Sequence, residues 1–117
     1  MTTNKESTRY YSDKHEKSVC KALNAVQQPN SGAGRWKKGD VVLEPASLLF
    51  ECKCSMKPKD SVSIKKDWIK KNHSESFFNR LDNTALCFNF EPNGDNYYVI
   101  DERLMQVLCE ALEEYYK

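Results

Sequence analysis

The chain has 117 residues, of which 39% are hydrophobic and 30% are charged. This length suits one compact domain spanning residues 1–117, and the composition is typical of a globular protein. No apolar run approaches the roughly 18 to 20 residues that cross a bilayer. The polar N-terminus lacks the apolar centre of a signal peptide, so we expect a cytoplasmic protein without a membrane partner.

The net charge of +1 conceals an uneven distribution along the chain. Residues 1–71 carry 15 Lys and Arg against 8 Asp and Glu, whereas residues 72–117 carry 3 against 9. A basic surface of this kind can bind phosphates, although uneven solvation of a small surface gives the same counts. The charge pattern alone therefore favours a nucleic-acid partner only slightly.

The five cysteines are odd in number, and we expect reduced, mostly buried thiols in place of a disulfide framework. Cys52 and Cys54 are closely spaced, but no second pair or Cys/His cluster completes a tetrahedral zinc site. His15 and His73 each stand among polar residues. We expect both histidines to lie at the surface.

The first third of the chain predicts a polar arm followed by a helix. Residues 1–11 have the composition of a loose arm, and the helix runs from a cap at Ser12 or Asp13 to about Gln28. Two glycines within residues 30–34 then predict a tight or mobile loop. The apolar stripe of the helix consists of Val19, Leu23 and Val26.

Short apolar runs predict four strands, over residues 40–44, 48–53, 84–90 and 97–100. Pro45 ends the first of them. The first two strands are joined by a short turn, and the last two are joined by a turn that contains Gly94.

Two further helices are predicted between and after these strands. Ser63 can cap a helix over about residues 64–78, on which we expect Trp68 to lie in the core or at an interface. Asp101 can cap a final helix whose apolar stripe is broad for so small a domain, so this helix could also help to form a dimer. The order of helices and strands predicts one α/β domain.

The residues best suited to chemistry lie on the first two predicted strands. Successive side chains of a strand alternate between faces, so Glu51 and Lys53 share one face while Phe50 and Cys52 point to the other. Asp40 on the neighbouring strand can bring a second carboxylate beside Glu51. A Glu-x-Lys triplet alone is weak evidence, because an exposed strand with an ion pair has the same sequence.

Two adjacent carboxylates repel each other unless a divalent cation lies between them. Mg²⁺ prefers hard oxygen ligands, so Asp40, Glu51 and the main-chain carbonyl of Cys52 would suffice to hold it, and Mn²⁺ should substitute for it. Lys53 could then orient or deprotonate an attacking water and stabilise the transition state of phosphodiester hydrolysis.

The pattern Gly39-Asp40 followed by Glu51-Cys52-Lys53 resembles the PD-(D/E)XK nuclease superfamily. Together with the loop over residues 30–35 and Glu16 on the first helix, it resembles the archaeal-type Holliday junction resolvases and their phage relatives, over roughly residues 12–100. The resemblance implies a restriction-endonuclease-like core, in which helices flank a small mixed central sheet. It also implies that Glu16 joins the metal site and that Ser31 lies near the scissile phosphate.

The chain departs from the family pattern at two places. Gly39 stands where the family often has proline before the first aspartate, a change that the superfamily tolerates. The helix after the Glu-x-Lys strand often carries a glutamine in the family, whereas residues 64–68 contain none. Lys65 or Lys66 could contact phosphate there instead.

The basic residues near the predicted centre are candidate contacts to DNA phosphates. Arg35 offers a bidentate fork beside a glycine-rich turn whose amides can bind anions. The turn is not a nucleotide-binding loop, because no Gly-Lys-Ser/Thr follows it. The other candidate contacts, which would add affinity without base specificity, are Lys37, Lys38, Lys57, Lys65 and Lys66.

The leading hypothesis is a Mg²⁺-dependent Holliday junction resolvase that acts as a homodimer, because a two-fold symmetric junction requires two symmetric active sites. A restriction-like, nicking or repair nuclease of the same fold is the second hypothesis. The third is a DNA-binding module without catalytic activity.

Overall fold

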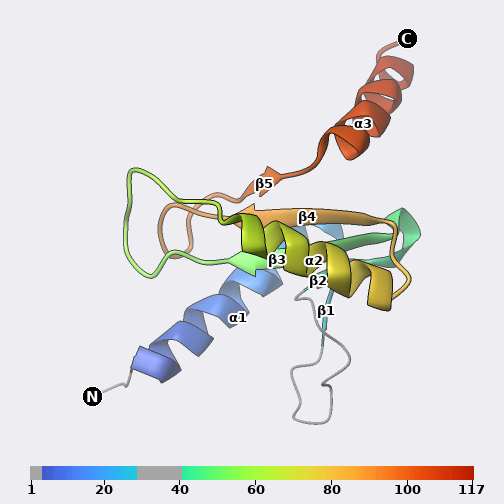
Figure 1. The fold of residues 1–117 in the computed structure, drawn as a ribbon. Coiled ribbons are helices and arrows are strands. Elements are labelled where there is room, and N and C mark those ends of the chain that lie inside the picture. The colour runs from blue at the N-terminus through green and yellow to red at the C-terminus, as the bar shows by residue number, and fades with distance from the viewer. Residues whose placement is uncertain (1–3, 29–40) are drawn as a thin grey trace.

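The computed structural model describes residues 4–28 and 41–117, and within these ranges it describes the side chains from residue 8 onward. The elements follow the order helix, strands, helix, strands, helix (Figure 1). They are α1 (Asn4–Leu23), β1 (Val26–Gln27), β2 (Val41–Leu43), the 3-10 turn η1 (Glu44–Ala46), β3 (Leu48–Lys53), α2 (Lys66–Phe78), β4 (Asn83–Phe88), β5 (Tyr97–Val99) and α3 (Glu102–Tyr115).

The strands of the described residues form one five-stranded mixed sheet in the order β1-β2-β3-β4-β5. β3 and β4 run parallel, and every other neighbouring pair is antiparallel. The crossover from β3 to β4 contains α2, as a parallel connection requires. The prediction of an α/β domain with a mixed sheet flanked by helices is confirmed at this level.

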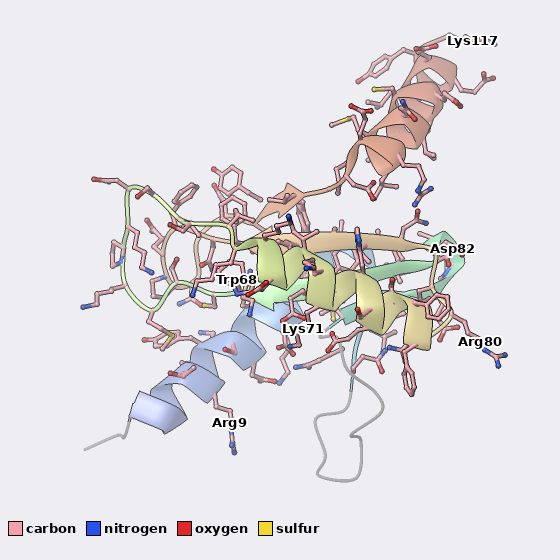
Figure 2. All side chains as sticks on the ribbon, in the orientation of Figure 1. Arg9, Trp68, Lys71, Arg80, Asp82 and Lys117 are labelled. Carbon is pink, nitrogen blue, oxygen red and sulfur yellow. The ribbon has the colours of Figure 1, made fainter. Side chains whose placement is uncertain are left out.

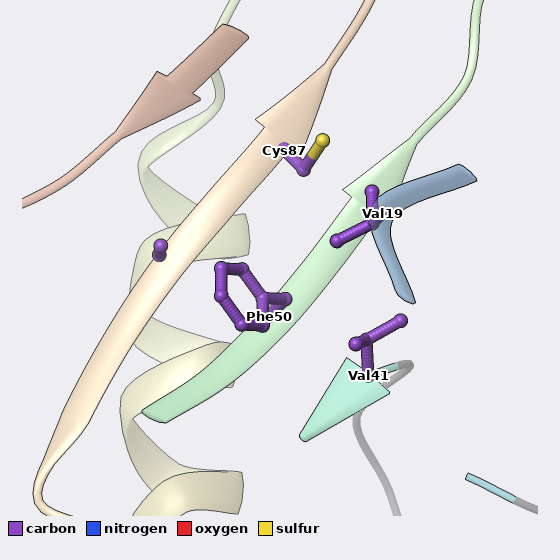
Figure 3. Packing of buried hydrophobic residues seen from close by; sticks show 5 residues of the cluster. Val19, Val41, Phe50 and Cys87 are labelled. Carbon is purple, nitrogen blue, oxygen red and sulfur yellow. The ribbon is translucent and has the colours of Figure 1, made fainter. Parts of the chain in front are cut away.

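The hydrophobic core lies between α1 and one face of the sheet (Figure 3). Val19 of α1 is fully buried against side chains of β2, β3 and β4, among them Phe50, which is 2% exposed. Burial of a residue of this size contributes about 1.5–3 kcal/mol. The remaining buried members of this cluster are Val41, Ala85 and Cys87.

The opposite face of the sheet is covered by α2. Strand alternation directs Leu49 and Leu86 to this face, and both are buried. The inner side of α2 is polar, because its buried residues are Asn72, Glu75 and Ser76. The Asn72 amide donates to the carbonyl of Ala85 over 3.1 Å, which fastens the helix to β4.

The first helix differs from its prediction at both ends. It begins at Asn4, so the prediction of a loose arm is wrong for residues 4–11. It ends at Leu23 and not near Gln28, because Asn24 adopts a left-handed conformation with φ of 57° and the chain then enters β1. Val26 is consequently a strand residue, and it is 66% exposed and not part of a helical stripe.

The starts of the two later helices differ in their capping. Asp101 caps α3 as predicted, since its side chain accepts from the amide of Leu104 over 2.9 Å. The prediction that Ser63 caps α2 is wrong: the N-cap is Lys65, which makes no side-chain capping bond. The start of α2 therefore leaves its amides without a side-chain acceptor at the cap.

α3 leaves the sheet after β5 and projects away from the rest of the described structure (Figure 1). Leu104 in its first turn is buried, whereas the larger apolar residues that follow are exposed. No helix of the described residues is long and apolar enough to cross a membrane.

Candidate functional site

Glu51 and Lys53 lie together on β3, as strand alternation predicts. Lys53 Nζ is 3.6 Å from Glu51 Oε2. Glu51 is only 6% exposed, while the side chain of Lys53 is 32% exposed. The carboxylate is therefore buried, and its lysine partner lies between it and the solvent. Phe50 and Cys52 point to the α1 face, which places the charged pair on the side of α2.

Lys53 is bounded by the indole of Trp68 in the first turns of α2. Lys53 Nζ lies 4.7 Å from the centroid of this ring, a distance at which a cation is attracted to the aromatic face. Figure 2 shows Trp68 on α2, which crosses in front of β3 and β4. We predicted Trp68 to lie in the core or at an interface, and it is half-buried.

The inner side of α2 adds polar residues that the sequence interpretation missed. Glu75 is 8% exposed, and one of its oxygens lies 3.8 Å from Lys71 Nζ. Within the described residues, Glu75 Oε1 and Asn72 Oδ1 are buried without a hydrogen-bond partner. The helix lacks the family's glutamine, yet it presents an amide and a carboxylate to the sheet. The spacing of Trp68, Asn72 and Glu75 at three to four residues was the signal that could have identified this side.

Glu16 lies on α1 and contacts β1. Its carboxylate accepts a hydrogen bond from the Gln27 amide over 2.8 Å, and the same amide donates to Asp13 over 2.9 Å. The hydrogen bonds from Gln27 and Lys17 hold the pKa of the Asp13 carboxyl below its usual range. The metal-binding role implied for Glu16 stays a prediction.

Several predicted site residues lie outside the described residues. The antiparallel register pairs Val41 with Phe50, and Asp40 precedes Val41 in the sequence. Within the described residues, no group of three His, Cys, Asp or Glu side chains is arranged to hold a metal ion. The expected ligand Asp40 is not among these residues, and neither are Ser31, Arg35, Lys37 and Lys38.

The described lysines of the expected DNA-binding set lie at the end of the sheet where β3 stops. Lys57 is exposed in the segment between β3 and α2. Lys65 and Lys66 are exposed at the start of α2, and Lys65 Nζ lies 5.9 Å from the Trp68 ring centroid. Lys65 and Lys53 therefore both lie near the Trp68 ring, and the DNA contacts expected of these lysines stay a prediction.

A second cluster of reactive side chains lies on the α1 face of the sheet. His15 is 4% exposed, and its Nε2 is 3.4 Å from Cys87 Sγ, so the prediction of a surface histidine is wrong. His73 is exposed, as expected. Hydrogen bonds from Cys52 and His15 lower the pKa of the Cys87 thiol to about 6, although burial opposes this change. Burial and the neighbouring charge of Cys87 raise the pKa of Tyr98.

All five cysteines are free, in agreement with the expectation of no disulfide. Cys87 is buried and Cys20, Cys52 and Cys54 are half-buried, whereas Cys109 on α3 is exposed. The expectation of mostly buried thiols therefore fails for Cys109. Burial raises the pKa of Cys20 and of Cys54 above the usual value.

Comparison with known proteins identifies no relative: no protein-family model, no curated protein and no solved structure matches this chain.

Proposed function

We propose that the chain is a Mg²⁺-dependent, structure-selective DNA endonuclease, with a Holliday junction as its preferred substrate. The observation that carries this proposal is the pair on β3: a buried carboxylate, Glu51, with the Lys53 ammonium 3.6 Å away. Burial of a charged group is costly without a partner or a function. A restriction-endonuclease-like core is the arrangement in which this pair would have a catalytic role.

The donor set on β3 fits a hard divalent cation. Glu51 offers a carboxylate and Cys52 offers a main-chain carbonyl. The Lys53 ammonium, 3.6 Å from Glu51, balances the charge of that carboxylate. Asp40, which directly precedes Val41 in the sequence, would supply a second carboxylate. The resemblance also implies Glu16 as a ligand, although its carboxylate is hydrogen-bonded to Gln27 and α1 packs on the face of the sheet opposite to that of Glu51.

Bound Mg²⁺ or Mn²⁺ would supply an activated water and neutralise charge on the scissile phosphate. Lys53 would hold that water through a hydrogen bond and stabilise the negative charge that develops on the phosphate oxygens. Trp68 would hold the ammonium group over its ring and thereby restrict the conformations of the Lys53 side chain. Ser31 and Arg35 would contact the same phosphate.

The basic residues would bind the DNA backbone on either side of the cut. The described contributors are Lys57, Lys65 and Lys66, which are exposed next to the end of β3. The remaining contributors would be Lys37 and Lys38. Such contacts predict binding that weakens as salt increases and that depends little on sequence.

The experiment compares cleavage of a four-way junction with cleavage of a linear duplex, a flap and a single strand, each with Mg²⁺ and with EDTA. We expect metal-dependent cleavage of the junction in preference to the other substrates. Equal cleavage of all four would favour the second candidate, a nicking or repair nuclease. Metal-independent binding without cleavage would indicate a DNA-binding module and contradict the enzymatic proposal.

A matched pair of variants identifies the site in the same assay. Glu51→Gln removes the buried carboxylate and should abolish cleavage, whereas Glu91→Gln removes an exposed carboxylate in the turn after β4 and should leave cleavage unchanged. Circular dichroism of both variants verifies that the fold is retained. Cleavage by Glu51→Gln at the rate of the unmodified protein would exclude this site.

A further inference from the structure

The apolar side of α3 is an exposed surface from which a binding partner can be inferred. Its first turn is tied to the body, because Arg103 donates to the carbonyl of Asp82 over 3.1 Å and to the side chain of Asn83. Beyond this turn α3 extends away from the sheet (Figure 1). The apolar side comprises Met105, Val107, Leu108, Leu112, Tyr115 and the C-cap Tyr116, which are between 42% and 79% exposed.

The sequence of α3 is amphipathic. At 100° per residue, five of these six side chains fall within an arc of about 100°, and Glu102, Gln106, Glu110 and Glu113 fall together on the polar side. Val107 lies at the edge of the apolar side, next to Glu114. A helix of this length is marginal in water when nothing packs against it. The six side chains expose apolar area on the order of several hundred Å², which is comparable with the roughly 800 Å² per partner of a standard protein interface.

The charges of α3 exclude two other kinds of partner. The polar side is dominated by glutamates, so an anionic membrane surface and the DNA backbone would both be repelled. An apolar side flanked by acidic residues instead fits another helix.

We propose that α3 pairs with α3 of a second copy of this chain, and that the two helices run antiparallel. Glu110, Glu113 and Glu114 lie in the C-terminal half of α3. A parallel pair would place these glutamates of both copies side by side. An antiparallel pair instead places them beside the N-terminal half of the other helix, which carries one glutamate, Glu102, together with Arg103, and where the helix dipole is positive. The inference does not rest on the proposed nuclease function, although a two-fold dimer would supply two sites for a symmetric junction.

The experiment measures the mass of the full chain in solution by sedimentation over a wide range of concentration. We expect a dimer of twice the 13.6 kDa chain mass. Leu112→Glu, on the apolar side, should raise the dimer dissociation constant at least about tenfold, because it removes a buried leucine from the interface. Gln106→Glu adds the same charge to the polar side and should leave the constant within about twofold.

Circular dichroism and the midpoint of urea denaturation verify that both variants remain folded. Neither substitution should disturb the sheet, because α3 projects away from it. A monomer at every concentration would overturn the proposal. So would a dimer that Leu112→Glu and Gln106→Glu affect equally.

Cys109 reports the direction of the two helices. It lies near the middle of α3 and is the only exposed cysteine of the five. In an antiparallel two-fold pair the two Cys109 side chains lie on the same side of the helix pair at the same level, and in a parallel pair they lie on opposite sides. A short bismaleimide should therefore cross-link the native dimer but not Cys109→Ser. A dimer that Leu112→Glu dissociates but that does not cross-link at Cys109 would overturn the antiparallel arrangement.

Discussion

Glu51 and Lys53 show how two charged side chains can be held under a helix. The carboxylate is buried, and the ammonium group lies 3.6 Å from it and 4.7 Å from the centroid of the Trp68 ring. An ion pair on an exposed strand would contribute about 0–1 kcal/mol to stability and would tolerate substitution. A buried carboxylate constrains its neighbours more strongly, because its charge requires compensation.

Trp68 should affect the rate of cleavage through Lys53. Replacing Trp68 by leucine keeps an apolar side chain but removes the cation–π contact, so the Lys53 ammonium gains freedom. We expect the cleavage rate to fall by about tenfold, because cation–π contacts contribute roughly 0.5–2 kcal/mol. The measurement is single-turnover cleavage, and Trp68→Phe should recover much of the rate. Equal losses in Trp68→Leu and Trp68→Phe would show that the indole ring itself, and not its aromatic face, is required.

Cys87 should make the stability of the protein depend on pH. Its pKa is lowered from 9.0 to about 6 in the folded chain. Between these two pH values the folded state holds a thiolate, whereas the unfolded state still binds a proton. The stability contributed by this group is complete above pH 9 and is lost as the pH falls through 6. Between these values the stability of the native chain relative to Cys87→Ser should rise with pH, by at most about 1.4 kcal/mol per pH unit.

Urea unfolding under reducing conditions at pH 6, 7.5 and 9 measures this difference, since linear extrapolation to zero urea gives the free energy of unfolding. Cys109→Ser, which changes an exposed thiol, is the matched control. A constant difference between the native chain and Cys87→Ser across this range would contradict the thiolate.

At the scale of the elements, one side chain caps the start of α3. Asp101 accepts from the amide of Leu104, and a lost N-cap costs about 1 kcal/mol. Asp101→Ala should reduce the helical circular dichroism signal and weaken any association through α3, while Asp101→Asn, which preserves the acceptor, should behave like the native chain. An unchanged signal in Asp101→Ala would show that packing and not the cap holds α3.

The strands were more predictable from sequence than the polar sides of the helices. β3 was predicted over its observed range, because apolar residues alternate there with Glu51 and Lys53 and a period of two identifies the faces. The inner side of α2 was missed, because Asn72 and Glu75 are buried polar residues and no apolar stripe marks them. The start of α1 was also missed, since residues 4–9 are polar and no apolar stripe of helical period marks this segment.

His15 could not be placed from sequence either. Its neighbours in the chain are polar, and it is buried beside Cys87, a residue far away in the sequence that only the sheet brings to it. By contrast, the pairing of Glu51 with Lys53 required only the strand itself. Features set by local periodicity were therefore predictable, and features set by contacts between distant elements were not.

At the scale of the whole molecule, the two faces of the sheet carry different kinds of residue. The α1 face holds the apolar core around Val19 and Phe50, and the α2 face holds the charged pair. Lys65 lies at the Trp68 ring, beside this pair, and the acidic α3 projects away from the sheet (Figure 1). This separation suits a protein that binds phosphates at one place and a second copy of itself at another.

The central claim is that Lys53 and its carboxylate neighbours cut DNA with a divalent cation. Its most direct test is single-turnover cleavage of an end-labelled four-way junction with Mg²⁺, by the native chain and by Lys53→Met, at an enzyme concentration that saturates binding. Lys53→Met keeps the length of the side chain and removes its charge. We predict Mg²⁺-dependent cleavage by the native chain and a loss of at least about 100-fold in Lys53→Met, with junction binding retained. Equal cleavage by the two proteins, or none by the native chain with either Mg²⁺ or Mn²⁺, would contradict the claim.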